Sequence, residues 1–122
     1  MDKVQALNNF WNSFGLPAYD ENTVPPDAPI PRITYNVVTD NLEHIVSLCA
    51  SIWYRSSSWK EITLKAAEIE KRLGEHGGVV IALDEGRMWI DRGQPFAQRM
   101  NDTDDSIRRI YMNIQVEYLT AY

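Results

Sequence analysis

The sequence predicts an α+β fold in which two helices pack on a mainly antiparallel sheet. Residues 45–56 alternate between apolar and polar side chains, and so does a long final strand that ends near residue 118. Such period-two alternation is typical of strands with one buried face. Between them lie a helical pattern after Ser58 and a short hairpin over 79–91. The predicted order is therefore α-β-β-α-β-β-β, and runs of strands interrupted by one central helix favour an α+β domain.

The composition indicates a globular protein with a single domain over residues 1–122. Hydrophobic residues make up 44% of the chain and charged residues 24%, a balance that disordered chains lack. A chain of this length can build one core and little more. Twelve Lys and Arg against seventeen Asp and Glu give a net charge of −5. This charge argues against a protein whose main task is to clamp nucleic acid, because that task needs surplus cations.

Residues 2–14 have the pattern of a short amphipathic helix. Asp2 is a suitable cap for its start, and Gly15 marks its end. Apolar side chains recur at intervals of three and four, which predicts one stripe docked on the core. The stripe consists of Val4, Leu7, Phe10, Trp11 and Phe14.

Five of the six prolines lie within residues 16–31. Each proline removes a backbone donor and fixes φ, so this segment is expected to form neither a helix nor a central strand. Residues 17–31 are therefore predicted to be an extended arm or surface loop. The alternating residues 32–39 that follow are predicted to form the first strand.

The strand over 45–56 has two different faces. The apolar face, predicted to be buried, carries Val46, Leu48, Ala50, Ile52 and Tyr54. The polar face carries Ser47, Cys49, Ser51, Trp53 and Arg55. Cys49 has no second cysteine with which to form a disulfide, and we expect it to be a small half-buried side chain.

The second half of the chain begins with a helix start signal. Ser58 and Glu61 have the spacing of a capping box, and the helix after them is expected to bury Ile62, Ala66, Ile69 and Leu73. Asp84-Glu85-Gly86 predicts a hairpin turn with Gly86 at positive φ. Residues 92–105 are expected to form a long polar loop. The last strand is expected to bury Ile110, Met112, Ile114, Val116 and Tyr118 and to expose Arg109, Tyr111, Asn113, Gln115 and Glu117.

No constellation of residues indicates catalysis, a cofactor or a metal ion. His44 and His76 stand in turn-like contexts without other ligands at suitable spacing. The aspartates around Asp104 lack the central Gly and the twelfth-position Glu of a calcium loop. Nucleophile-elbow, phosphate-loop and zinc-protease motifs are missing as well. We therefore expect no enzyme and no cofactor, and no membrane association, because no apolar run approaches the ~20 residues that span a bilayer.

Aromatic residues are numerous, with four Trp, six Tyr and three Phe. Trp53 and Tyr111 fall on the polar faces of their strands. Aromatic and arginine side chains on a sheet face are typical of protein–protein contacts. Two interpretations remain open: either this face binds a partner, or the sheet is covered on both faces and Trp53 packs under the N-terminal helix.

Several segments together resemble one protein family. They are the proline-rich approach to Pro31-Arg32-Ile33-Thr34-Tyr35-Asn36, the run from Ile52-Trp53-Tyr54-Arg55-Ser56 through Ser58-Trp59-Lys60-Glu61, and the long last strand. In their order and spacing, over roughly residues 5–118, they are similar to the small tail-terminator, or tail-completion, proteins of long-tailed bacteriophages and prophages. The predicted order of helices and strands also resembles the fold of that family.

The resemblance implies a structural role without catalysis. Such proteins form a hexameric ring on the head-proximal end of the finished tail tube, stop polymerisation of the tube protein and offer a surface to the head connector. The implied partners are further copies of the chain, the major tail tube protein and a connector or head-closure protein. The implied location is the virion neck, after assembly in the host cytoplasm. DNA would only pass through the channel, and negative charge fits that use because it disfavours adhesion.

A cyclic ring needs two different complementary patches on each subunit. The arm 17–31 and the loop 92–105 are expected to make contacts, because loops often carry function on a rigid scaffold. Candidate interface residues are Trp53, Arg55, Arg108, Arg109 and Tyr111, with Asp102, Asp104 and Asp105 as acidic partners or lumen residues. The alternatives are another neck component, such as a head-closure or connector protein, and a small monomeric binding module.

Overall fold

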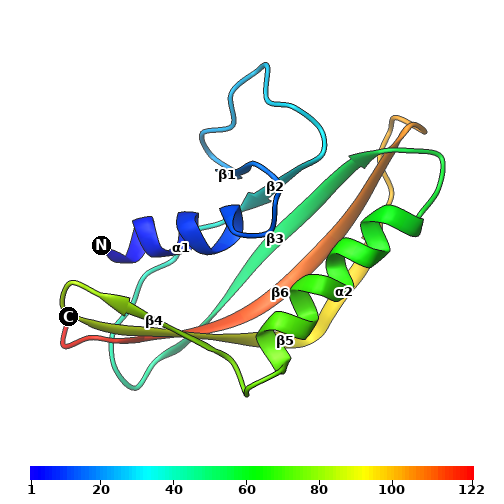
Figure 1. Ribbon diagram of the computed structural model, residues 1–122. Helices are drawn as coiled ribbons and strands as arrows, with labels where there is room; N and C mark the ends of the chain where they lie inside the picture. The colour runs from blue at the N-terminus through cyan, green and yellow to red at the C-terminus, as the bar shows by residue number, and fades with distance from the viewer.

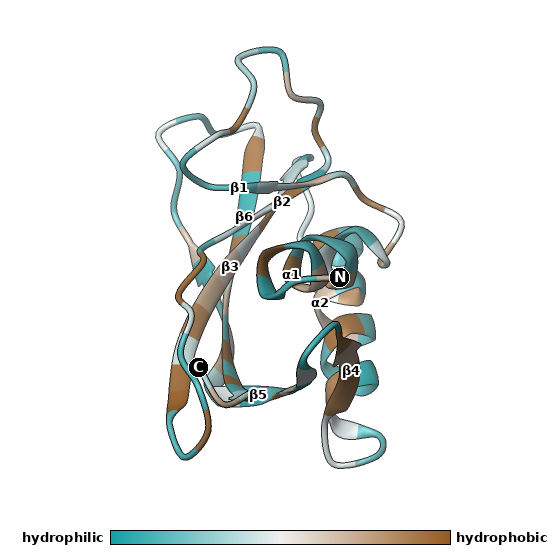
Figure 2. Cartoon of the chain, turned by 90° about the vertical axis from the view of Figure 1, so that its left-hand side faces the viewer, coloured by the Kyte–Doolittle hydropathy of each residue, from teal (hydrophilic) through white to brown (hydrophobic).

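Six strands form one curled sheet, and both helices pack inside its curve (Figures 1 and 2). The computed structural model describes residues 1–122. Its elements are α1 (Lys3–Asn12), β1 (Ala18–Asp20), β2 (Arg32–Tyr35), β3 (Ile45–Arg55), α2 (Lys60–Gly74), β4 (Val79–Leu83), β5 (Gly86–Met100) and β6 (Ile107–Leu119). The strands are ordered β1-β2-β3-β6-β5-β4, and every pair is antiparallel except β1 with β2. The predicted α+β class is confirmed.

Helix α1 begins as the sequence predicts. The Asp2 carboxylate accepts a hydrogen bond from the Gln5 amide at 2.8 Å, and the Gln5 side chain accepts one from the Asp2 amide at 3.0 Å, which together form a capping box. Leu7 and Trp11 are fully buried. Val4, however, is 49% exposed. Its assignment to the buried stripe was wrong, because Val4 lies at the edge of the helix face that points into the core.

Helix α2 buries the predicted stripe but starts differently. Ile62, Ala66, Ile69 and Leu73 are its buried residues. The expected capping box is wrong: the Ser58 hydroxyl accepts from the Lys60 amide at 3.1 Å, and Trp59 is the N-cap residue without a side-chain cap bond. The Ser58 hydroxyl therefore binds the amide of Lys60 and not that of Glu61, which the capping box would require.

The two longest-paired strands, β3 and β6, hold the centre of the sheet. Their register places Ala50 opposite Met112 and Ile52 opposite Ile110, and these four side chains are buried on the helix side. Burial alternates along β6 from Arg109 to Leu119, as predicted. The buried residues of both helices and of β1, β2, β3, β5 and β6 form one hydrophobic cluster of 23 residues, so a single core supports the sheet.

The segment expected to be the loop 92–105 is mostly strand. β5 continues to Met100 and pairs with β6, with an irregularity between Arg92 and Ala97. The bulge absorbs Pro95, whose missing amide would interrupt a regular ladder. Gly93 fits there because an added Cβ would lie 2.9 Å from the Cβ of Asn113. The connection to β6 therefore shrinks to residues 101–106.

The proline-rich segment also needs correction. Ala18–Asp20 form strand β1, which pairs in parallel with β2 at the edge of the sheet. The arm expected over 17–31 is thus a loop only from residue 21 onward. β2 ends at Tyr35, four residues before the predicted strand end. The hairpin turn before Gly86 is confirmed, with φ of 105° at that glycine.

Candidate interaction surface

One face of the sheet is left without a helix. In Figure 2, α1 and α2 both lie on the same side of β3 and β6, and no helix lies on the other side. We call this the outer face. Along β6 it carries only partly exposed side chains, those of Arg109, Tyr111, Asn113, Gln115 and Glu117. The interpretation that the sheet is covered on both faces, with Trp53 under the N-terminal helix, is therefore wrong.

Trp53 stands between two arginines on this outer face. The strand register places it between Arg32 of β2 and Arg109 of β6. The Arg109 guanidinium lies 4.5 Å from the indole centroid and that of Arg32 lies at 5.7 Å. The indole Nε1 donates to the Thr34 hydroxyl at 3.0 Å, and Arg109 Nε donates to the Ser51 hydroxyl at 3.0 Å. These bonds hold the stack in place against the strands.

Neither guanidinium of this stack has a carboxylate within 4.0 Å; the ion pairs of the chain lie elsewhere. A guanidinium over an indole keeps its N–H donors free at the rim for an acceptor. Arg32 Nη1 donates to the Ala28 carbonyl at 3.1 Å, and its Nε is buried without a hydrogen-bond partner. The stack therefore presents two guanidinium groups that no carboxylate of the chain neutralises.

Tyr111 continues the same face toward the middle of the sheet. It lies opposite Ser51 of β3, and Cys49 is two residues from Ser51 on the same face of that strand. Hydrogen bonding with the Cys49 thiol, followed by burial, raises the pKa of Tyr111. The phenol of Tyr111 therefore stays neutral at physiological pH. Cys49 is half-buried as expected.

The turn between β5 and β6 holds the three candidate aspartates. Asp104 accepts from the Ser106 hydroxyl at 2.7 Å and from the Ser106 amide at 2.9 Å, and Arg55 lies 3.6 Å away. The Ser106 hydrogen bonds, and then the Arg55 charge, lower the pKa of Asp104. Asp102 accepts from the Asp104 amide at 2.9 Å. These carboxylates shape the turn, and Arg55 anchors it to the end of β3.

Arg108 points to the opposite side of the sheet from Arg109. Its guanidinium donates to the Ser57 and Asp105 carbonyls and lies 5.3 Å from the Trp59 ring centroid. Arg99 lies over the same ring at 4.7 Å. A second arginine–tryptophan–arginine stack therefore forms at the start of α2. Adjacent residues of a strand face opposite sides, which explains the separation of Arg108 from Arg109.

The structure brings the eight candidates together at one end of the sheet, in two groups. Trp53, Arg109 and Tyr111 share the outer face, whereas Arg55, Arg108 and the three aspartates surround the β5–β6 turn. Sequence reasoning missed Arg32, Trp59 and Arg99. A signal for Arg32 was present, since it alternates with Ile33 in the run before Asn36. Arg99 could not be placed on the sheet, because the sequence assigned it to the loop 92–105.

The comparisons with known proteins add no relative: neither a scan against family models nor a search of curated proteins finds a match. No helix is long and apolar enough to cross a membrane. No three His, Cys, Asp or Glu side chains gather in a way that could hold a metal ion.

Proposed function

We propose that this chain is a phage tail-terminator protein, a subunit of a ring that caps the head-proximal end of a tail tube. The observation that carries the proposal is the outer face, where an arginine–tryptophan–arginine stack stands on a sheet that no helix covers. Side chains of these types concentrate at protein interfaces. The order of segments in the sequence, which is similar to that of tail terminators, supplies the identity of the partner.

The fold suits such a role in two respects. The core lies entirely on the helix side, so the outer face can bind a partner without disturbing the core. The stack is held by the Ser51 and Thr34 hydroxyls, so little side-chain freedom is lost when a partner binds. The proposal includes the ring partners, the tube protein and the connector, with DNA passing through the channel.

The first test measures the mass of the purified protein by light scattering, alone and with tubes made from the neighbouring tube protein. A sixfold mass, or electron-microscopic density on one end of the tubes, is the expected result. A strict monomer that ignores tubes would overturn the proposal and favour a head-closure protein, which can also be rich in strands, or a monomeric binding module.

A charge-reversal pair connects the test to the surface. Arg55→Glu with Arg109→Glu should abolish oligomers and tube capping while the circular dichroism spectrum stays unchanged. The matched control is Lys71→Glu with Arg92→Glu, which makes the same change in net charge at two exposed residues. The control protein should cap tubes as the wild type does.

A further inference from the structure

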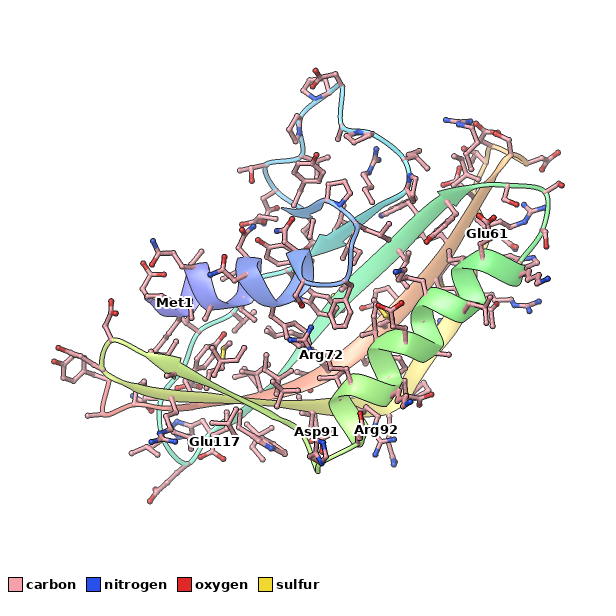
Figure 3. All side chains as sticks on the ribbon, in the orientation of Figure 1. Met1, Glu61, Arg72, Asp91, Arg92 and Glu117 are labelled. Atoms are coloured by element: carbon pink, nitrogen blue, oxygen red, sulfur yellow. The ribbon has the colours of Figure 1, made fainter.

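The end of the sheet that lies away from the two arginine–tryptophan–arginine stacks is built from four segments that lie far apart in the sequence. They are the start of α1, residues 38–45, the turn between β4 and β5, and the end of β6. The Leu42 amide donates to the Thr120 carbonyl at 3.0 Å, and the Lys3 ammonium donates to the Asp40 carbonyl at 2.8 Å. In Figure 3, Met1 and Glu117 lie at this end, whereas Glu61 lies at the other end of the molecule.

An open pocket of about 820 Å³ lies at this end, between the start of α1, the β4–β5 turn and the last residues after β6. Eight large hydrophobic side chains of the chain are exposed, and six of them belong to the four segments. These six are Met1, Val4, Val38, Leu42, Ile45 and Tyr122. Three of them, Met1, Val4 and Tyr122, line the pocket. Exposed apolar side chains that lie together in this way mark a contact surface.

Carboxylates surround the exposed apolar residues. The acidic end, as we call it, carries Asp2, Asp40, Glu43, Asp84, Glu85 and Glu117. The cationic groups nearby are Lys3, Arg87 and the N-terminal ammonium of Met1. The Lys3 ammonium is bound by the carbonyls of Asp40 and Tyr122, and the Met1 ammonium forms an ion pair with Asp84. The surface is therefore both apolar and negatively charged.

The end with the two tryptophan stacks has the opposite charge. This arginine end carries Arg32, Arg55, Arg99, Arg108 and Arg109. The β5–β6 turn adds three aspartates to these five arginines, and one of them, Asp104, is paired with Arg55. Positive charge on aromatic rings at one end thus complements negative charge around apolar side chains at the other.

We infer that the acidic end of one subunit binds the arginine end of a second copy of this chain, head to tail. The occupant is a second copy because the same chain carries both complementary surfaces. These arginines fit an apolar surface bordered by carboxylates, since their aliphatic stems can cover apolar side chains while the guanidiniums pair with the acids. Two different patches make a heterologous contact, which closes into a ring when the rotation permits. The inference deepens the proposed function and rests on it for the ring.

Two one-sided variants test this contact. Arg55→Glu with Arg99→Glu reverses the arginine end, and Glu43→Lys with Glu85→Lys reverses the acidic end; all four side chains are exposed. Each variant alone retains one functional patch and should remain a monomer by sedimentation velocity. Mixed together, they should associate, because the intact acidic end of one variant meets the intact arginine end of the other. The fourfold variant with both ends reversed should associate again.

A matched control uses Glu70→Lys with Glu75→Lys, two exposed glutamates of helix α2 and its C-cap. It makes the same change in net charge as the acidic-end variant and should associate as the wild type does. Circular dichroism must show that every variant is folded. A mixture that stays monomeric up to the highest soluble concentration would overturn the inference.

The outcomes separate the inference from the proposed function. Wild-type protein that caps tubes, together with a mixture that forms no dimer, would overturn the head-to-tail contact and leave the tail terminator standing. Association of the mixed variants, together with wild-type protein that ignores tubes, would support the contact and overturn the tail-terminator assignment.

Discussion

The guanidinium of Arg109 lies over the indole of Trp53, 4.5 Å from the ring centroid, and is held there by its bond to Ser51. Arg109 belongs to β6 and Trp53 to β3, and the register makes them direct cross-strand neighbours. The pair therefore joins the two central strands on the face that lacks a helix. It is also the part of that face with the most specific geometry.

Replacing Arg109 should cost stability even in the monomer. Arg109→Ala removes the guanidinium–indole contact and the bond to Ser51, so we expect a loss of roughly 0.5–2 kcal/mol in the free energy of unfolding. Urea unfolding followed by circular dichroism measures the change. Arg87→Ala is the control, because that exposed side chain should shift stability by less than about 0.5 kcal/mol. Equal effects for the two variants would contradict a role of the stack in holding the strands together.

Helix α1 should owe its position to a few buried side chains. Leu7 is fully buried, so Leu7→Ala should lower the free energy of unfolding by about 2–5 kcal/mol through lost burial and a new cavity. Val4 on the same helix is 49% exposed, and Val4→Ala should change it by less than about 0.5 kcal/mol. Thermal and urea unfolding of the pair compare them directly. A large effect of Val4→Ala would show that Val4 is buried in solution.

Tyr118 should make the protein sensitive to alkali. Burial raises the pKa of Tyr118 from 10.0 to about 12, because the phenolate would lose its hydration. The folded state therefore favours the neutral phenol. This stabilisation is fully present below pH 10 and is lost as the pH rises through about 12. Two pKa units correspond to roughly 2.7 kcal/mol.

Tyr118→Phe separates this titration from packing. The Tyr118 hydroxyl donates to the Val38 carbonyl at 2.7 Å, so the variant should lose about 1 kcal/mol at neutral pH. It should then lose less stability than the wild type between pH 10 and pH 12. Urea unfolding at several alkaline pH values measures both effects. Parallel pH profiles of the two proteins would contradict the assignment to Tyr118.

Ser106 should control the ionisation of Asp104. Its hydroxyl is the largest cause of the lowered pKa of Asp104, so Ser106→Ala should raise that pKa toward the usual value. Stability from this group is present above the unfolded-state pKa and is lost as the pH falls through the folded-state one. A carboxyl NMR titration of Asp104 in both proteins measures the shift. An unchanged pKa would show that the turn forms without this hydrogen bond.

The sequence by itself determined the elements whose signal is local. Alternation predicted the buried residues of β6 and three of the five expected on β3, Leu48, Ala50 and Ile52, because a strand places successive side chains on opposite faces. Val46 and Tyr54 are only partly buried, and Ser51 of the polar face is buried. Asp2 and the 3/4 spacing of apolar residues predicted α1, and Gly86 predicted the hairpin turn. The polar face of β6 could also be assigned, which brought Arg109 and Tyr111 into the candidate surface. Each of these features depends on residues close together in the chain.

Tertiary structure decided the features that depend on distant partners. β5 extends past Pro95 because β6 supplies a ladder on which a bulge can absorb the proline. β1 forms inside a proline-rich segment because β2 offers a free edge. The strand order placed Arg32 and Arg109 on either side of Trp53 and gathered apolar and acidic residues at the far end. Alternation says which side chains share a face, but only the packing of both helices on one side decided which face stays open.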